Sequence, residues 1–315
     1  MEPCYRDNKD EEEDKQYSYP MEVIRSSVLP LVLKAVIELE VLDIIAKEGP
    51  GAQLSASEIA SRLPAPAAFG LNPDAPEMLD RMLRFLASHS ILTCSAAISS
   101  SDDPTPTGPA APVGQTRVYG LAPVAKYFVP DRDGVSLGYL LFMSQDKVHI
   151  NSWYELKGAV LEGGIPFERV HGMHAFEYCG KDVRFNEVFN KAMQCGTKLL
   201  IKKIVHSYKG FEQLQSLVDV GGGLGVSLSL ITAKIAIKAL PEHGKVIVVE
   251  TILPAIVDTS DAARSAFHID LLMMTELGGK ERTEQEYRNL AVGAGFSGIK
   301  LDCYACTLWV MEFYK

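Results

Sequence analysis

The feature that most constrains the fold is a short apolar run that leads into a glycine-rich turn and then into a helical pattern. Residues 217–220 read Leu-Val-Asp-Val, residues 221–225 read Gly-Gly-Gly-Leu-Gly, and a pattern typical of a helix begins at Val226. A strand–turn–helix of this kind opens nucleotide-binding α/β units. Glycines permit positive φ and leave no Cβ between backbone and ligand, and the helix behind them offers free N–H groups. The sequence therefore predicts an α/β domain with a nucleotide-type cofactor, and its cofactor-binding candidates are Asp219, Gly221, Gly222, Gly223 and Gly225.

The spacing of the glycines narrows the kind of cofactor. A phosphate loop would need Gly-Lys-Ser/Thr, which does not occur here, and a dinucleotide loop would need glycine where this chain has Val226. Gly-Gly-Gly-x-Gly after Val-Asp-Val instead resembles motif I of S-adenosylmethionine-dependent methyltransferases. Asp219 is expected to contact the charged end of that cofactor, and its alternative is an ordinary turn residue.

The N-terminal part has the element order of a winged-helix module. A chain of 315 residues is expected to form about two domains. Helical periodicity begins at Pro20 and is expected to be kinked or split at Pro30. A capping box at Ser55-Ala-Ser-Glu58 starts a second helix, and a third follows Asn72. Two strand-like runs, residues 91–94 and 118–121, then flank a loop rich in serine and proline, so this part is predicted to be mostly helical with a long-tipped hairpin.

Charge and composition limit the partners. Winged-helix modules can bind DNA or pair subunits. The net charge of −9 opposes nucleic acid and an anionic membrane. Residues 1–19 are acidic at their start and are predicted to be a disordered tail. No window is apolar enough to span a bilayer, and six cysteines make no disulfide framework, so a cytoplasmic protein is expected.

Two cysteines have the spacing of a redox or metal pair. Cys303 and Cys306 enclose Tyr-Ala, but no second Cys/His pair accompanies them. They are predicted to lie at a bend of a C-terminal hairpin over residues 299–314, and no metal site is expected.

Beyond the glycine turn, the chain resembles plant caffeic acid O-methyltransferases and related phenylpropanoid and flavonoid O-methyltransferases. The matching stretches are residues 143–148, 152–154, 163–167, 175–178, 184–190, 217–223, 239–250, 268–270 and 278–283. The resemblance implies an α/β protein with two domains. The first is a helical, winged-helix-like dimerisation domain over residues 20–125. The second, over residues 126–315, is a Rossmann-like S-adenosylmethionine-dependent methyltransferase domain with a shortened sheet.

The resemblance also implies the substrate, the partner and the substrate-binding residues. The reaction would transfer a methyl group from S-adenosylmethionine to a phenolic hydroxyl, and the chain would pair as a homodimer or with a full-length homologue. The phenolic pocket would draw on Met143, Ala175, Phe185, Phe189, Met193, Ile269 and Met273. Periodicity alone would place these residues in an ordinary core. Ser144 and Cys179 stand where the family usually has Asn and His, which leaves the preferred ring substituents open.

A block of the cofactor domain is missing between residues 226 and 244. A strand–helix–strand unit takes about 30 residues, yet the next strand, residues 245–250, begins 20 residues after Gly225. The acid that would hold the ribose is expected about 20 residues past the glycines, and no Asp or Glu occurs between Asp219 and Glu242. The resemblance implies that this block also carries the general base, a His before Asp-Trp. None of the seven histidines precedes Asp-Trp.

Two carboxylates remain that, by resemblance, would orient the missing imidazole: Glu250 and Glu281. A phenol has a pKa near 10 and must lose its proton to attack a methyl group, so loss of the base typically costs about 10²–10⁴-fold in rate. His243 and His268 are weak candidates to replace the base. The sequence thus leaves two hypotheses open: an impaired O-methyltransferase, or an inactive shortened form that acts as a dimerisation partner. A DNA-binding protein is a distant third.

Overall fold

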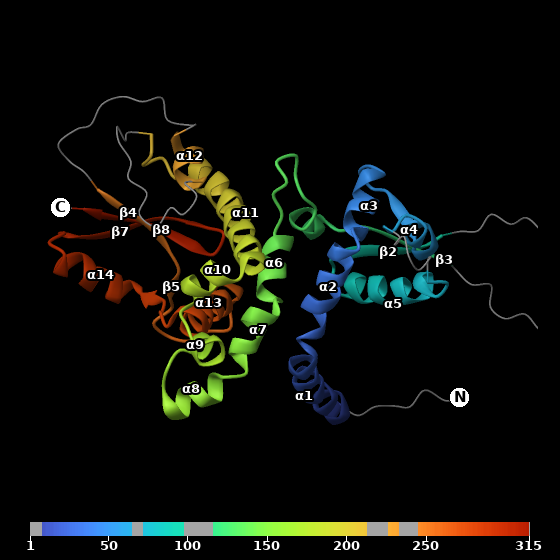
Figure 1. Cartoon of the computed structure of the whole chain (residues 1–315), viewed down its shortest axis with the longest axis horizontal. Coiled ribbons are helices and arrows are strands. Elements are labelled where there is room, and N and C mark those ends of the chain that lie inside the picture. The colour runs from blue at the N-terminus through green and yellow to red at the C-terminus, as the bar shows by residue number, and fades with distance from the viewer. Residues whose placement is uncertain (1–7, 65–71, 98–115, 213–225, 233–244, 315) are drawn as a thin grey trace, which may run out of the picture. The chain divides into compact units, whose positions relative to one another are not determined.

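The computed structural model describes residues 8–64, 72–97, 116–212, 226–232 and 245–314, which form two compact units divided between Leu141 and Phe142 (Figure 1). The division lies later in the chain than the domain boundary expected at residues 125 and 126. The glycine turn, residues 221–225, lies outside the described residues.

The first unit contains five helices and a small sheet among its described residues. The helices are α1 (Asn8–Arg25), α2 (Val28–Glu38), α3 (Val41–Lys47), α4 (Ala56–Ala60) and α5 (Ala75–Ser88), followed by a 3₁₀ turn (Pro123–Tyr127). Strands β1 (Gln53–Ser55), β2 (Leu92–Ala97) and β3 (Thr116–Leu121) pair antiparallel in the order β1-β3-β2. Fully buried side chains, among them Val36, Leu42, Leu83, Leu86 and Tyr119, form one core. The predicted helical module with a hairpin is confirmed, and the expected long tip of that hairpin, residues 98–115, lies outside the described residues.

Local signals at helix starts are confirmed in part. Ser55 and Glu58 form the expected reciprocal capping box of α4. The expected split of the first helical stretch near Pro30 is confirmed, and Pro30 lies in the first turn of α2, where no intrahelical N–H is lost. The break falls before it, at residues 26–27.

Helix α1 differs from the expected disordered tail. It covers residues 8–19 of that tail, and its exposed side chains include Tyr17 and Ile24. Arg25 in the last turn of α1 suits the negative end of the helix dipole.

The sequence pattern of residues 135–162 predicts a helix that ends at Gly163 and Gly164, and a single helix there is wrong. Three short helices occupy it: α6 (Gly138–Ser144), α7 (Lys147–Trp153) and α8 (Leu156–Glu162). Asp146 takes an extended backbone conformation and its side chain caps α7 by accepting from the Val148 N–H. That local hydrogen bond competes with helix continuation and ends the run.

Large apolar residues at four-residue steps (Phe185, Phe189 and Met193) predict a long helix over residues 182–208. This helix is confirmed as α11 (Val183–Ser207), and Asp182 caps it. Two shorter helices, α9 (Pro166–His171) and α10 (Ala175–Lys181), precede it.

The C-terminal sheet is covered on both faces. Strands β4 (Val246–Glu250), β8 (Leu308–Tyr314) and β7 (Gly298–Ala305) pair antiparallel in that order. Side chains alternate between faces along a strand. Accordingly, Val310 packs with α11 and α12 (Val226–Thr232), whereas Met311 packs with α14 (Glu284–Gly293). Figure 1 shows α11 and α14 on either side of this sheet.

A second, two-stranded sheet joins the carboxylate-bearing segments. Strands β5 (Ile252–Leu253) and β6 (Arg282–Thr283) are parallel, with α13 (Asp261–Leu277) between them. Within the described residues, the second unit therefore holds a three-stranded and a two-stranded sheet, in line with the expected shortening. The expected strand at residues 217–220 lies outside them.

The C-terminal hairpin is confirmed. Its turn is formed by Cys306 and Thr307, both with positive φ, and Cys303 and Cys306 are free thiols. The Cys-x-x-Cys spacing thus reflects a bend between β7 and β8.

Candidate functional site

The two carboxylates predicted to orient a base lie at the start of neighbouring parallel strands. Glu250 ends β4 just before β5, and Glu281 immediately precedes β6. The register of β5 and β6 pairs Ile252 with Arg282, which brings the two glutamates to the same end of the small sheet. The Glu281 N–H donates to Asp270 Oδ1 at 2.8 Å, which anchors this segment to α13.

The electrostatics of this end of the sheet favour protonated carboxyl groups. Burial, and then the negative charges of Glu250 and Asp270, raise the pKa of Glu281. Burial also raises the pKa of Glu250, although part of its side chain still meets solvent, and the Arg282 guanidinium partly offsets this. A carboxyl group with a raised pKa can hold or accept a proton nearer neutral pH. The pair is therefore a place where a proton can be held.

Three predicted pocket residues come together around α10 and α11. Ala175 and Phe185 belong to one buried cluster with Val148 and Phe167. The rings of Phe185 and Phe189 lie 6.4 Å apart, and Tyr178 packs edge-on against Phe185 at 5.9 Å. Aromatic side chains at these separations stabilise each other and offer flat faces to another ring.

The remaining predicted pocket residues are less uniformly placed. Met143 on α6 is buried, Ile269 and Met273 on α13 are half-buried, and Met193 on α11 is 38% exposed. Met143 and Met193 are not members of the buried cluster that contains Phe185. Their assignment to a substrate pocket stays a prediction.

A buried histidine–glutamate pair was not predicted from the sequence. His149 on α7 and Glu276 on α13 lie with Nδ1 and Oε1 3.0 Å apart, and their side chains are only 7% and 4% exposed. The His149 ring packs 5.3 Å from that of Phe185. One signal was available: Ile269, Met273 and Glu276 recur at helical spacing on one face of α13.

The structure describes only one of the two histidines proposed as replacement bases and none of the predicted cofactor-binding residues. His268 lies on α13 with an exposed side chain, whereas His243 lies outside the described residues. Asp219, Gly221, Gly222, Gly223 and Gly225 also lie outside them, so their cofactor role stays a prediction. Helix α12 begins at Val226, directly after the glycines, as the strand–turn–helix pattern requires.

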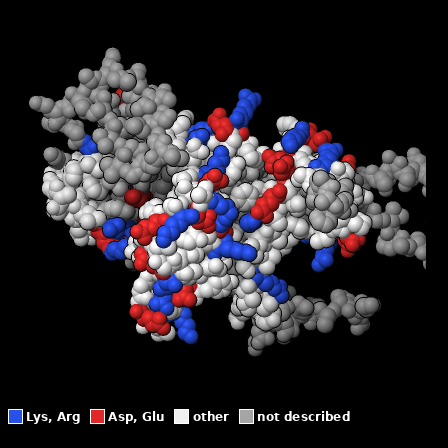
Figure 2. Space-filling view, in the orientation of Figure 1, with Lys and Arg blue, Asp and Glu red and all other residues white. Residues whose placement is uncertain are grey.

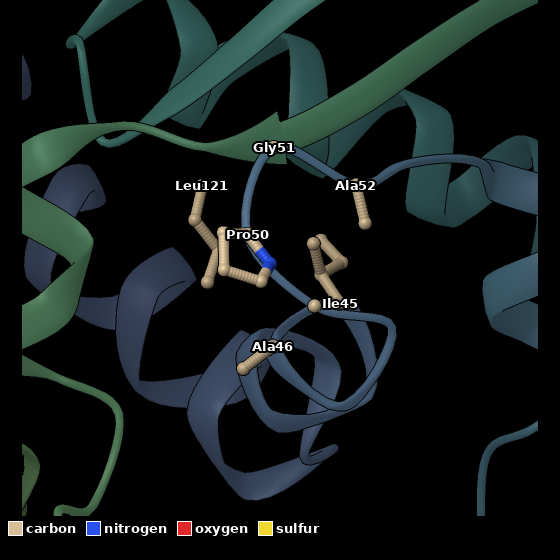
Figure 3. Close-up of a pocket in the computed structure, with 7 residues that line it drawn as sticks. Ile45, Ala46, Pro50, Gly51, Ala52 and Leu121 are labelled. Atoms are coloured by element: carbon tan, nitrogen blue, oxygen red, sulfur yellow. The ribbon is translucent and has the colours of Figure 1, made fainter.

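Two further surface features can be followed in the described part of the chain. A shallow pocket of the first unit is lined by apolar groups, chiefly Ile45, Ala46, Pro50, Ala52 and Leu121 (Figure 3). On the face shown in Figure 2, Lys and Arg side chains are interspersed with Asp and Glu. None of the helices in the described part of the chain combines the length and apolar character needed to cross a membrane.

Two family models match the chain. The model described as an O-methyltransferase dimerisation domain matches residues 21–131. The model described as an O-methyltransferase domain matches in two pieces, residues 153–236 and 229–297. The two pieces overlap over residues 229–236, inside the segment, residues 226–244, where the sequence predicts missing residues.

Curated relatives match over almost their whole length. O-methyltransferase 13 of Lophophora williamsii is 45% identical over 365 aligned residues, covering 96% of this chain and 96% of the relative. Caffeic acid 3-O-methyltransferase 3 of Populus kitakamiensis is 45% identical, covering 96% of this chain and 95% of the relative. An aligned length of 365 exceeds the 315 residues of this chain, so the alignment contains positions that the chain lacks.

Solved structures show the same fold. The structure of human N-acetylserotonin methyltransferase in complex with SAM aligns with a TM-score of 0.70, 16% identity and coverage of 99% of both chains.

Proposed function

The chain belongs to the O-methyltransferase family that carries an N-terminal dimerisation domain and includes caffeic acid 3-O-methyltransferases, and we propose that it methylates a phenolic hydroxyl at a reduced rate. S-adenosylmethionine would be the methyl donor, and a phenylpropanoid or flavonoid the acceptor. The observation that carries this proposal is the carboxylate pair, Glu250 and Glu281, which lies where β5 and β6 begin.

The aromatic cluster supports a phenolic acceptor. Phe185 and Phe189 present rings from successive turns of α11, and the small side chain of Ala175 lies in the same buried cluster as Phe185. An apolar site with few polar groups is typical of small-molecule pockets. Met143, Met193, Ile269 and Met273 are proposed to complete it.

The residues of the chain fit only part of the cofactor. Asp219 and the glycines would hold its amino-acid end. A strand that could carry a ribose-binding acid must lie between α12 and β4, and the only acid there is Glu242. When bound, S-adenosylmethionine would supply an electrophilic methyl group on a sulfonium.

Removal of the phenolic proton is the step for which this chain lacks the usual residue. Because no His-Asp-Trp motif is present, Glu250 and Glu281 have no imidazole from that motif to orient. Burial raises the pKa of both carboxyl groups, which makes them better proton acceptors than an ordinary glutamate, whereas a phenol has an unperturbed pKa near 10. Weak acceptance of the phenolic proton is expected to lower the rate by about 10²–10⁴-fold relative to a histidine base.

A second candidate is an inactive dimerisation partner, and the positions missing from the chain favour it. The first unit has a complete core of its own, so it could pair with another subunit while the shortened second unit contributes no chemistry. In either case we propose that the chain forms dimers in the cytoplasm, with its dimerisation domain at residues 20–125 and its methyltransferase domain at residues 126–315.

Titration calorimetry with S-adenosylmethionine, followed by a methylation assay with caffeic acid, separates the two candidates. Saturable binding and slow product formation that is lost in Glu250→Gln would support the enzyme. No binding, together with co-purification with a full-length homologue in a co-expression experiment, would support the partner and contradict the enzyme. Arg288→Gln, which alters an exposed ion pair on α14, serves as the matched control.

A further inference from the structure

We propose that His149 and Glu276 form a polar recognition site for a hydrogen-bond donor carried by the aromatic ligand, such as a second ring hydroxyl or an ammonium group. The inference deepens the proposed function, because it rests on the aromatic cluster around Phe185 holding a ring. It adds specificity residues that the sequence did not indicate.

The first observation is incomplete hydrogen bonding of buried atoms. Although His149 Nδ1 and Glu276 Oε1 lie 3.0 Å apart, their orientation does not make a hydrogen bond. Both ring nitrogens of His149 and both carboxylate oxygens of Glu276 lack a hydrogen-bond partner within the described residues. Buried polar groups in native proteins are normally satisfied, so each exception calls for an explanation such as an absent ligand.

The second observation is where the pair lies. His149 packs its ring against Phe185, a member of the aromatic cluster. Glu276 follows Ile269 and Met273 by seven and three residues on α13, which places all three on one face of that helix. Helix α13 packs against α7, the helix of His149. The polar pair thus adjoins the residues proposed to hold the ring of the substrate.

The chemistry of the pair defines the ligand group. A carboxylate only accepts hydrogen bonds, and imidazole can accept or donate through either nitrogen. A ligand that donates to Glu276 and meets the free nitrogen of His149 would satisfy both. A hydroxyl beside the methylated position and an ammonium on a side chain share this donor chemistry. A site built around such a contact strongly rejects analogues that lack it, because its own groups are left unpaired.

The test is ligand binding, which needs no methyl transfer. Titration calorimetry on the full chain would compare cinnamic acid, 4-hydroxycinnamic acid and caffeic acid with tyramine and dopamine. The hydroxycinnamic acids probe a ring hydroxyl, and the two amines probe an ammonium. The variants are Glu276→Gln, His149→Leu and the paired replacement H149L/E276L, which removes both polar groups together and so leaves no lone buried charge. H206L/E187L, two exposed residues of α11, is the control.

In wild type, we expect removal of one donor group from the ligand to weaken binding about tenfold or more. In H149L/E276L the same removal should change the Kd less than twofold, and the control should match wild type. Equal discrimination in wild type and H149L/E276L, or no saturable binding of any probe to wild type, would overturn the inference. If the paired variant loses discrimination while S-adenosylmethionine does not bind, the proposed activity fails and this inference stands.

Discussion

Replacing Tyr208 with Phe tests what holds the shortened C-terminal sheet to α11. Tyr208 follows α11, is almost fully buried, and donates its hydroxyl hydrogen to Glu312 Oε1 on β8, which also pairs with Lys245. A hydrogen bond to a charged group contributes about 1.5–3 kcal/mol. Phe keeps the ring, and Lys245 still neutralises Glu312, so we expect the lower end: a loss of about 1.5 kcal/mol in the free energy of unfolding.

The loss should depend on pH in a defined direction. Burial alone would raise the pKa of Glu312, but hydrogen bonds from Lys245 and Tyr208 outweigh it and lower that pKa in the folded state. A lowered pKa contributes stability that is present above the unfolded pKa and disappears as pH falls through the folded one. The difference between wild type and Tyr208→Phe should therefore be full at pH 7 and shrink below about pH 4.3.

Tryptophan fluorescence during urea unfolding measures this change in unfolding free energy within the second structural unit, which contains Tyr208. The chain has two tryptophans, Trp153 and Trp309, and both belong to the second unit. Tyr304→Phe on β7 is the control, because Tyr304 is 47% exposed on the same hairpin. Equal midpoints for wild type and Tyr208→Phe, or a difference that does not change between pH 7 and pH 3.5, would refute the reasoning.

Three further substitutions follow from the same structure. Glu281→Gln should stabilise the protein at pH 7–8. A group with a raised pKa in the folded state contributes stability below its unfolded pKa, and that stability is lost as the pH rises through the folded pKa. The gain of the variant over wild type, measured by thermal unfolding, should therefore vanish below about pH 4. Phe185→Ala should lower the unfolding free energy by about 3–5 kcal/mol through the cavity it leaves, measured by tryptophan fluorescence; a cost under about 1 kcal/mol would mean that the aromatic cluster is loosely packed. Tyr119→Phe removes a 2.6 Å hydrogen bond to Asp80 in the first unit and should cost about 1 kcal/mol by circular dichroism, with no cost if Asp80 is fully satisfied by Arg117.

Much of the local structure was predictable because short-range chemistry sets it. The capping box at Ser55 starts α4, and Asp182 caps α11 where a run of large apolar residues begins. The turn at Cys306 closes the last hairpin. Where competing local signals met, the prediction failed: Asp146 formed a cap and divided one expected helix into shorter ones.

The candidate site was predictable only where a motif names its residues. The sequence pointed to Glu250 and Glu281, but the tertiary structure decides that Glu281 is buried and that the parallel register of β5 and β6 brings Glu250 near it; burial first and then the charge of Glu250 raise the pKa of Glu281. No local pattern links His149 to Glu276, because they come together only through the packing of α7 on α13.

The sequence by itself determined the family, the glycine turn and the absence of a His-Asp-Trp motif, since these are properties of residue order. Tertiary structure alone decided which side chains are buried together, and therefore which polar atoms are left without a partner. The reason is physical: desolvation and charge proximity depend on distances between segments far apart in the chain, and a linear sequence does not contain those distances.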